Sequence, residues 1–393
     1  MPVYIIPLIV TLAIQTQVSL VVFTPPILAP QAQFDIGVEA AAVGMVTSLI
    51  YLSSVFATLL SGQILNKMGA IRVSQLCILL TSLGMLLMTI PNHLVIGVGA
   101  IIIGFGYGPI TPASSMILAN SVPQNLRGLI FSIKQSGVPL GGAAAGLLVP
   151  GLLVAFGWQK AAVIVAFIGI ILMASSNFFQ KIIDAEKPKF DSADKSDIFT
   201  PLKLIFGNSR LKELALSSGI YSGMQMSLGT FLVVLLTESA ELSITVAGGA
   251  LSAAMLGGAF GRLFWGYVSD NFLSPRFVLG ILGLIMSISA FAVSLVSPSW
   301  PLILVYGLAI IYGASAAGWN GVYLAEVANI VKPQTVAAAT GGSLTVTYSG
   351  VVIIPMLFWT AYIMTSSYAY PFVMLGVLSL VPGLLFLKNN SSF

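Results

Sequence analysis

Long apolar runs separated by short polar segments occupy nearly the whole chain. Twelve of these runs reach the length of about 20 residues that a helix needs to cross the roughly 30 Å hydrocarbon core of a bilayer. They lie near residues 4–29, 39–61, 70–90, 94–119, 128–155, 159–180, 211–236, 243–266, 277–296, 300–325, 336–361 and 368–387. Backbone polar groups find no water in lipid, and the alternation of a barrel strand is absent, so the pattern predicts twelve membrane-spanning helices.

The first run has no Lys or Arg before it, so we expect it to be retained as a span rather than removed as a signal peptide. The longest polar stretch, residues 183–206, divides the runs into six and six. Its mixture of charged residues, Ser and Pro is typical of a solvated linker. We therefore expect an all-α membrane protein with six-helix bundles at residues 1–182 and 207–393, joined by a cytoplasmic linker.

Composition supports this interpretation and excludes several classes of function. Only 7% of the residues are charged and 57% are hydrophobic, with a mean hydropathy of +1.01, whereas soluble domains carry about 25% charged residues. The one cysteine, Cys77, lies in an apolar run and is expected to be a buried, inert thiol. The one histidine, His93, lies in a polar turn without metal-binding or catalytic partners. Neither an enzyme nor a bound cofactor is expected, and the P-loop pattern of ATP-driven proteins is absent.

The distribution of positive charge predicts the orientation in the membrane. With both termini inside, thirteen of the sixteen Lys and Arg residues fall on the cytoplasmic side, which is the positive-inside rule. They are Lys67, Arg72, Arg127, Arg276, Lys332, Lys388 and seven more between Lys181 and Lys212. Because the net charge of +4 is spread over short loops, we expect no nucleic-acid partner.

The polar segment after the second run carries a recognisable motif. It reads Gly62-Gln-Ile-Leu-Asn66-Lys67-Met-Gly69-Ala-Ile-Arg72. On these residues, and over essentially its whole length, the chain resembles the major facilitator superfamily, whose motif is Gly-x-x-x-Asp-Arg-x-Gly-Arg-Arg/Lys. Asn66 replaces the usual Asp, and Lys67 replaces the usual Arg. The resemblance implies a twelve-helix transporter of small solutes that works as a monomer.

A second copy of the motif follows the eighth run, as Gly266-Tyr-Val-Ser-Asp270 and then Arg276, and it retains the acid. Duplicated halves allow many transporters to alternate between two states. In the family these loops form a cytoplasmic gate, for which a helix-ending glycine and charges reaching across a crevice are suited. The resemblance therefore assigns gating to Gly62, Asn66, Lys67, Gly69, Arg72, Gly266, Asp270 and Arg276.

The fourth and fifth runs are rich in glycine. The fourth contains Gly104-Phe-Gly106-Tyr-Gly108-Pro109, and the family motif that it resembles places an Arg where Ala100 stands. Proton-driven members that use that Arg are therefore poorer guides to this chain. The GxxxG spacing at Gly137–Gly141 predicts close helix packing.

Two cations lie inside the apolar runs, Lys134 in the fifth and Arg262 in the eighth, whereas every acid lies in or beside a loop. A cation at mid-bilayer costs about 2.5–3.5 kcal/mol on insertion scales. Both are therefore expected to face a wet cavity, where they would suit an anion. Two alternatives stay open: Lys134 could extend to the cytoplasmic face, and Arg262 could pair with Asp270.

The position of Arg262, four residues before Gly266, resembles the substrate-anion arginine of monocarboxylate transporters, of the oxalate–formate exchanger and of nitrate transporters. Nitrate is disfavoured, because Thr58 stands where those transporters carry a matching Arg. Polar groups that could complete a substrate site are Gln15, Thr16, Gln17, Tyr107, Tyr221, Gln225, Trp319, Asn320, Thr345, Thr347 and Tyr348.

The sequence thus predicts alternating-access transport of a small organic anion, a monocarboxylate in our interpretation, with proton coupling, exchange and passive flux all open. The alternative is efflux of a hydrophobic drug or neutral metabolite by a proton antiporter, in which Arg262 and Lys134 are gate residues or extend to the membrane surface. In either case the expected location is a plasma membrane, the bacterial inner membrane, with both termini in the cytoplasm.

Overall fold

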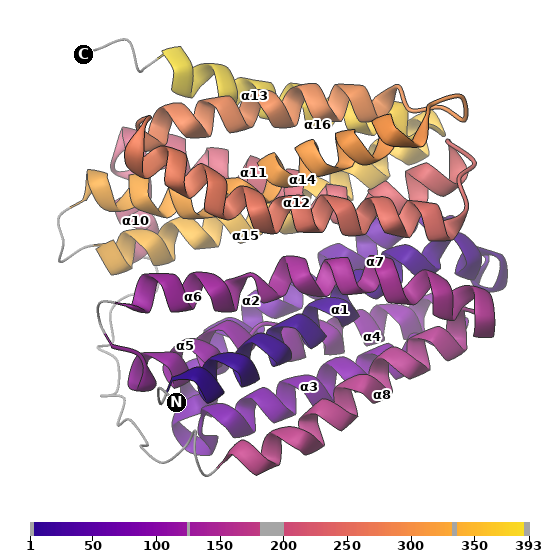
Figure 1. Ribbon diagram of the computed structural model, residues 1–393, viewed down its shortest axis with the longest axis horizontal. Coiled ribbons are helices and arrows are strands. Elements are labelled where there is room, and N and C mark those ends of the chain that lie inside the picture. Colours follow the sequence, from indigo (N-terminus) through magenta and orange to yellow (C-terminus); the bar gives the residue numbers. More distant parts are fainter. Residues whose placement is uncertain (1–3, 124–125, 181–199, 332–335, 389–393) are drawn as a thin grey trace. The chain divides into compact units, whose positions relative to one another are not determined.

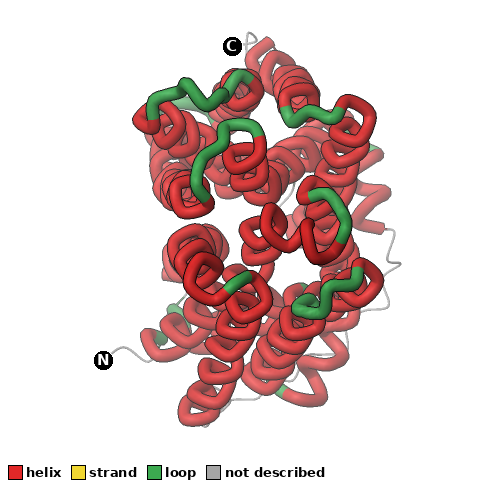
Figure 2. The backbone as a smooth tube through the Cα atoms, turned by 90° about the vertical axis from the view of Figure 1, so that its right-hand side faces the viewer, coloured by secondary structure: helices red, strands yellow, loops and turns green. Residues whose placement is uncertain are grey.

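The computed structural model describes residues 4–123, 126–180, 200–331 and 336–388. Helices joined by short loops make up this part of the chain (Figures 1 and 2). Twelve helical segments of the described residues are long and apolar enough to cross a membrane. The predicted fold class is therefore confirmed.

The chain divides into two compact units, Met1–Ala193 and Asp194–Phe393. The first contains α1 (Ile5–Ile36), η1 (Ala40–Ala42), α2 (Val43–Met68), α3 (Ala70–Leu87), α4 (His93–Tyr107), α5 (Ile110–Ser121), α6 (Arg127–Gln135), α7 (Gly137–Phe156), α8 (Trp158–Ser176) and η3 (Asn177–Phe179). The second contains α10 (Thr200–Phe206), α11 (Ser209–Glu238), α12 (Ile244–Asn271), α13 (Pro275–Ser294), α14 (Leu302–Ile330), α15 (Val336–Thr365) and α16 (Ala369–Lys388).

The two units share a pattern of helix packing. In the first unit, α1 packs on α7, α2 on α4, and α3 on α8. In the second unit, α11 packs on α15, α12 on α14, and α13 on α16. Counted as membrane spans, these are the same three pairs in each half. The two gate motifs repeat in the sequence, and the same pairs of spans pack together in each unit. The two halves therefore resemble each other in both sequence and helix packing.

Glycines bring several of these pairs close together. A Cβ atom on Gly104 of α4 would clash with the carbonyl oxygen of Ile50 in α2. One on Gly257 of α12 would lie 2.6 Å from the carbonyl oxygen of Ile310 in α14. Only a residue without a side chain permits such backbone approach.

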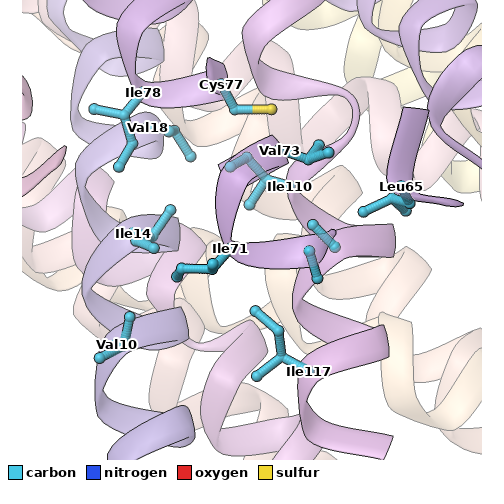
Figure 3. Packing of buried hydrophobic residues seen from close by; sticks show 12 residues of the cluster. Val10, Ile14, Val18, Leu65, Ile71, Val73, Cys77, Ile78, Ile110 and Ile117 are labelled. Carbon is cyan, nitrogen blue, oxygen red and sulfur yellow. The ribbon is translucent and has the colours of Figure 1, made fainter. Parts of the chain in front are cut away.

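Between these contacts, aliphatic side chains fill the first unit. Figure 3 shows Cys77 among Val18, Val73, Ile78 and Ile110, which all belong to one buried cluster. The thiol is buried, as the sequence predicted.

The structure interrupts two spans that the sequence predicted to be continuous. The fourth ends at Tyr107 and resumes at Ile110, because Pro109 has no N–H for the helix ladder. The fifth is broken at Ser136, between α6 and α7, and this break places Lys134 in the last turn of α6.

The predicted linker also contains a helix. Residues 200–206 form α10, which packs against α11 and α15. The remainder of the predicted linker, residues 183–199, lies outside the described residues.

Candidate functional site: a polar group around one cation in each unit

In the first unit, Lys134 is fully enclosed, with 1% of its surface exposed. Its ammonium group donates hydrogen bonds to Oε1 of Gln15 and to Oε1 of Gln135, both at 2.9 Å. Gln15 in turn donates to the hydroxyl of Ser19 at 3.3 Å. Both recorded partners of the cation are neutral amides, which satisfy its hydrogen atoms without neutralising its charge.

The start of α7 makes room for this arrangement. A Cβ on Gly137 would lie 2.9 Å from both Cβ and Cγ of Gln15. The stem of Gln15 therefore runs against the backbone of α7 and brings its amide to Lys134. Lys134 also lies at the carboxyl end of α6, where the helix dipole favours a cation.

In the second unit, Arg262 of α12 reaches across to α14. Its Nε donates to the carbonyl oxygen of Ala317 at 3.1 Å. Asn320 donates to the same oxygen at 3.3 Å and to Oε1 of Gln225 in α11, also at 3.3 Å. Three of the predicted substrate residues, Arg262, Asn320 and Gln225, thus belong to one hydrogen-bonded chain over three helices.

Small residues allow α12 and α14 to approach beside Arg262. A Cβ on Gly258 would lie 2.8 Å from the Cβ of Ala317, and one on Gly261 would lie 2.8 Å from the Cα of Ala314. The carbonyl of Ala317 therefore comes within reach of the guanidinium. The hydrogen bond that it accepts from Nε fixes the orientation of this group.

Two further predicted residues adjoin this chain. Trp319 is 1% exposed, and its ring meets the ring of Tyr221 edge-on at 6.0 Å. Tyr221 shares a face of α11 with Gln225, as its spacing predicted, and its hydroxyl donates to the carbonyl of Leu279 at 2.8 Å. The ring of Tyr323 also meets that of Trp319 edge-on, at 5.5 Å.

Two predicted site residues lie elsewhere. Tyr107, at the end of α4, meets Tyr51 of α2 edge-on at 5.6 Å. Tyr348 is exposed on α15, whereas its neighbour Thr347 is buried and hydrogen-bonded to Ser218 at 2.6 Å. Sequence reasoning omitted Ser218, although the spacing of Ser218, Ser222 and Gln225 places all three on one face of α11.

The first gate motif has one residue with a special backbone. Gly69 adopts a φ of 84°, which favours glycine, and it separates α2 from α3. Lys67 and Arg72 are exposed on either side of it. Gly62 and Asn66 belong to α2, but their surroundings lie outside the described part of the structure.

The second gate motif differs from the expectation at one position. Helix α12 continues through Gly266 to Asn271, so no helix ends at this glycine. Asp270 is exposed in the last turn. Arg276 forms an ion pair with Glu213 of α11 and lies 5.1 Å over the ring of Phe386 in α16. Arg276 therefore ties three helices of its own unit together.

At the opposite helix ends, each unit carries an acid–aromatic hydrogen bond. In the first unit, Nε1 of Trp158 in α8 donates to Asp35 in α1 at 2.6 Å. In the second unit, the hydroxyl of Tyr368, just before α16, donates to Glu238 of α11 at 2.6 Å. Burial and the adjacent Glu238 carboxylate raise the pKa of Tyr368.

A cavity of about 170 Å³ lies in the first unit at this end, lined by α1, η1, α2, α3, α4 and α8. Its walls are mainly aliphatic and include Met45, Met85 and Met88. Lys134 does not line it, so it is separate from the polar group around that cation. The described residues contain no cluster of His, Cys, Asp and Glu that could hold a metal ion.

Comparison with known proteins agrees with this architecture. The chain is 22% identical to the benzoate transport protein of Acinetobacter baylyi over 356 residues, which cover 81% of this chain and 75% of that protein. It is 23% identical to the gentisate transporter of Corynebacterium glutamicum, over 88% of this chain and 78% of that protein.

Among solved structures, it superposes on a bacterial homologue of the human lysosomal transporter Spinster, crystallised in an inward-facing, occupied conformation, with a TM-score of 0.75. The sequence identity is 16%, and the match covers 100% of this chain and 98% of that one. The sequence profile of the Major Facilitator Superfamily matches residues 8–355. The protein therefore belongs to the Major Facilitator Superfamily of membrane transporters.

Proposed function

We propose that this protein transports a small organic anion, a monocarboxylate, by alternating access. The observation that carries this proposal is the enclosed ammonium of Lys134, whose recorded partners are two neutral amides. A buried charge is costly unless an opposite charge accompanies it. A carboxylate substrate supplies that charge during each transport cycle.

Arg262 is the second residue in the proposal. Ala317 holds its Nε, so the guanidinium is pre-oriented at the edge of a polar chain that contains Asn320 and Gln225. A planar guanidinium binds a carboxylate through parallel hydrogen bonds. The curated names of two relatives, transporters of benzoate and gentisate, support the same substrate class.

The test is uptake of radiolabelled benzoate and other carboxylates into proteoliposomes. We expect Arg262→Ala and Lys134→Ala to lose roughly ten- to a hundredfold in kcat/KM, because hydrogen bonds to charged groups contribute about 1.5–3 kcal/mol. Lys160→Ala is the matched control, since Lys160 is an exposed cation at the start of α8. An imposed pH gradient shows whether a proton accompanies the anion.

Full activity in both variants, with correctly folded protein, would contradict the charged-site proposal. Efflux of a hydrophobic drug or neutral metabolite would then be the leading function, and fluorescent-dye efflux would test it. We further propose that the protein acts as a monomer in a bacterial plasma membrane with both termini in the cytoplasm, as the distribution of Lys and Arg indicates.

A further inference from the structure

The indole of Trp319 carries a polar atom that its surroundings do not satisfy. The side chain is 1% exposed, and Nε1 has no hydrogen-bond partner among the described atoms. An indole N–H can only donate, and leaving a buried donor unpaired costs about 1–3 kcal/mol. Phenylalanine would fill the aromatic slot between Tyr221 and Tyr323 without this cost. An acceptor from outside the chain, a ligand oxygen or a water molecule, would remove this cost.

A second donor lies one turn further along α14. Tyr323 is 2% exposed, and its hydroxyl has no well-formed hydrogen bond among the described atoms, although the hydroxyls of Ser218, Ser343 and Thr347 are close enough to interact with it. Residues four apart share a helix face and are separated by about 6 Å along the axis. The two donors thus belong to the face of α14 that meets α11.

The polar chain of Arg262 reaches the same turn of α14. The carbonyl of Ala317 that binds Arg262 is two residues before Trp319, and Asn320 follows Trp319 directly. The contact of Arg262 on α14 therefore lies within two residues of the Trp319 donor, and Tyr323 follows one turn later.

We propose that Trp319 Nε1, assisted by the Tyr323 hydroxyl, binds a hydroxyl or other oxygen substituent of the substrate, so that the protein prefers hydroxylated carboxylates to unsubstituted ones. This inference rests on the proposed function and specifies its substrate class. A site built to pair with a substrate hydroxyl rejects the analogue that lacks it, because its own polar groups are then left unpaired.

The experiment compares kcat/KM in proteoliposomes for benzoate and for its ring-hydroxylated analogues, including gentisate. We expect wild-type protein to prefer the hydroxylated acids. Trp319→Phe should lower kcat/KM for them by about three- to tenfold, the worth of one neutral hydrogen bond, and leave benzoate unchanged. Tyr323→Phe, which removes a single oxygen atom, provides the same test if Trp319→Phe does not fold.

Two matched controls separate this role from a general effect of the substitutions. Trp359→Phe makes the same change at a half-buried position of α15. Tyr312→Phe removes another buried, unpaired hydroxyl on the same face of α14, about 10 Å along the helix from Trp319. Both should leave the ratio of hydroxylated to unsubstituted substrate unchanged.

The outcomes are distinct. If wild-type protein transports no carboxylate, the proposed function itself fails. If carboxylates are transported but Trp319→Phe and Tyr323→Phe leave the substrate ratio unchanged, the donors serve the fold or an internal water, and this inference is overturned. A ratio that falls in either variant and not in the controls establishes the specificity role.

Discussion

At the scale of single residues, two buried glutamines of α1 allow a hydrogen bond to a charged group to be compared with one to a neutral group. Gln15 accepts from the ammonium of Lys134, whereas Gln17 donates to the carbonyl of Val165 at 3.0 Å. Both are buried. Hydrogen bonds to charged groups contribute about 1.5–3 kcal/mol and neutral ones about 1 kcal/mol. We expect Gln15→Leu to lower the melting temperature of the purified protein about twice as far as Gln17→Leu, which serves as its control.

Thermal unfolding in detergent, followed by scattering or fluorescence, measures both shifts. Equal shifts would mean that Lys134 gains no charge-assisted bond from Gln15. Such a result would weaken the case for an enclosed cation.

The sequence identified Lys134 and Arg262 because a charge inside an apolar run is conspicuous. It did not identify Ser218, since hydroxyls are common in membrane helices and bond their own backbone. It named the neighbours Thr347 and Tyr348 together, although Thr347 is buried and Tyr348 is exposed. A membrane span has apolar residues both on the side that faces lipid and on the side that faces protein. The spacing of its apolar residues therefore does not show which residue points toward the protein interior.

At the scale of helix pairs, Gly141 tests the close approach of α7 to α1. A Cβ at this position would lie 2.8 Å from the backbone nitrogen of Leu20, and the contact with the carbonyl oxygen of Thr16 is closer still. Backbone atoms cannot move aside as a flexible side chain can. We expect Gly141→Ala to destabilise the protein by about 1–3 kcal/mol and to reduce its yield from membranes.

Gly151→Ala is the matched control in the same helix, because a Cβ there has nothing within 4 Å. It should leave the melting temperature unchanged or raise it slightly, since alanine favours helix more than glycine does. Equal melting temperatures for the two variants would show that the approach of α7 to α1 does not require glycine at position 141.

The acid–aromatic bond between Tyr368 and Glu238 joins α16 to α11 and should give a pH-dependent contribution to stability. The folded-state pKa of Tyr368 is raised, while a tyrosine in an unfolded chain ionises near 10. The unfolded state therefore releases its proton first, and the contribution is complete below about pH 10 and is lost as the pH rises above it.

We expect Tyr368→Phe to melt at a lower temperature than wild-type protein at pH 7–9, and the difference to shrink above about pH 10. Melting curves of the two proteins across this range provide the measurement. A difference independent of pH would mean that the hydroxyl contributes packing only. Trp158→Phe in the first unit makes the corresponding change at Asp35 and should lower stability without an alkaline transition, because indole does not titrate there.

The breaks in the fourth and fifth spans mark the limit of sequence reasoning at this scale. A window of about 20 residues measures whether a segment can span the bilayer, and it does not detect one non-helical residue such as Ser136. The two membrane-spanning segments are predicted correctly, because a chain that crosses the bilayer must form a helix of about this length. The interruption depends on how α6 and α7 pack against α1, which only the tertiary structure supplies.

At the scale of the whole molecule, hydropathy alone predicted the twelve spans because lipid permits so few alternatives. Orientation is a separate question, and it rests on the distribution of positive charge. The single cysteine makes the orientation testable by labelling. Because Cys77 is 2% exposed, we expect almost no reaction of the wild-type protein with a membrane-impermeant maleimide. Single cysteines introduced at exposed positions then report the side on which each position lies.

With both termini inside, His93→Cys before the fourth span and Ser239→Cys after the seventh should react in intact cells, because these exposed turns face outward. Arg72→Cys and Asn271→Cys, exposed at the two gate motifs, should react only after the membrane is permeabilised. The reverse pattern would place the gate motifs and most of the Lys and Arg residues outside. A mixed pattern within one unit would mean that a helix counted as a span does not cross the membrane. Since the positive-inside rule acts through many charges at once, no single loop decides the orientation, and agreement of all four positions is the result that the charge distribution requires.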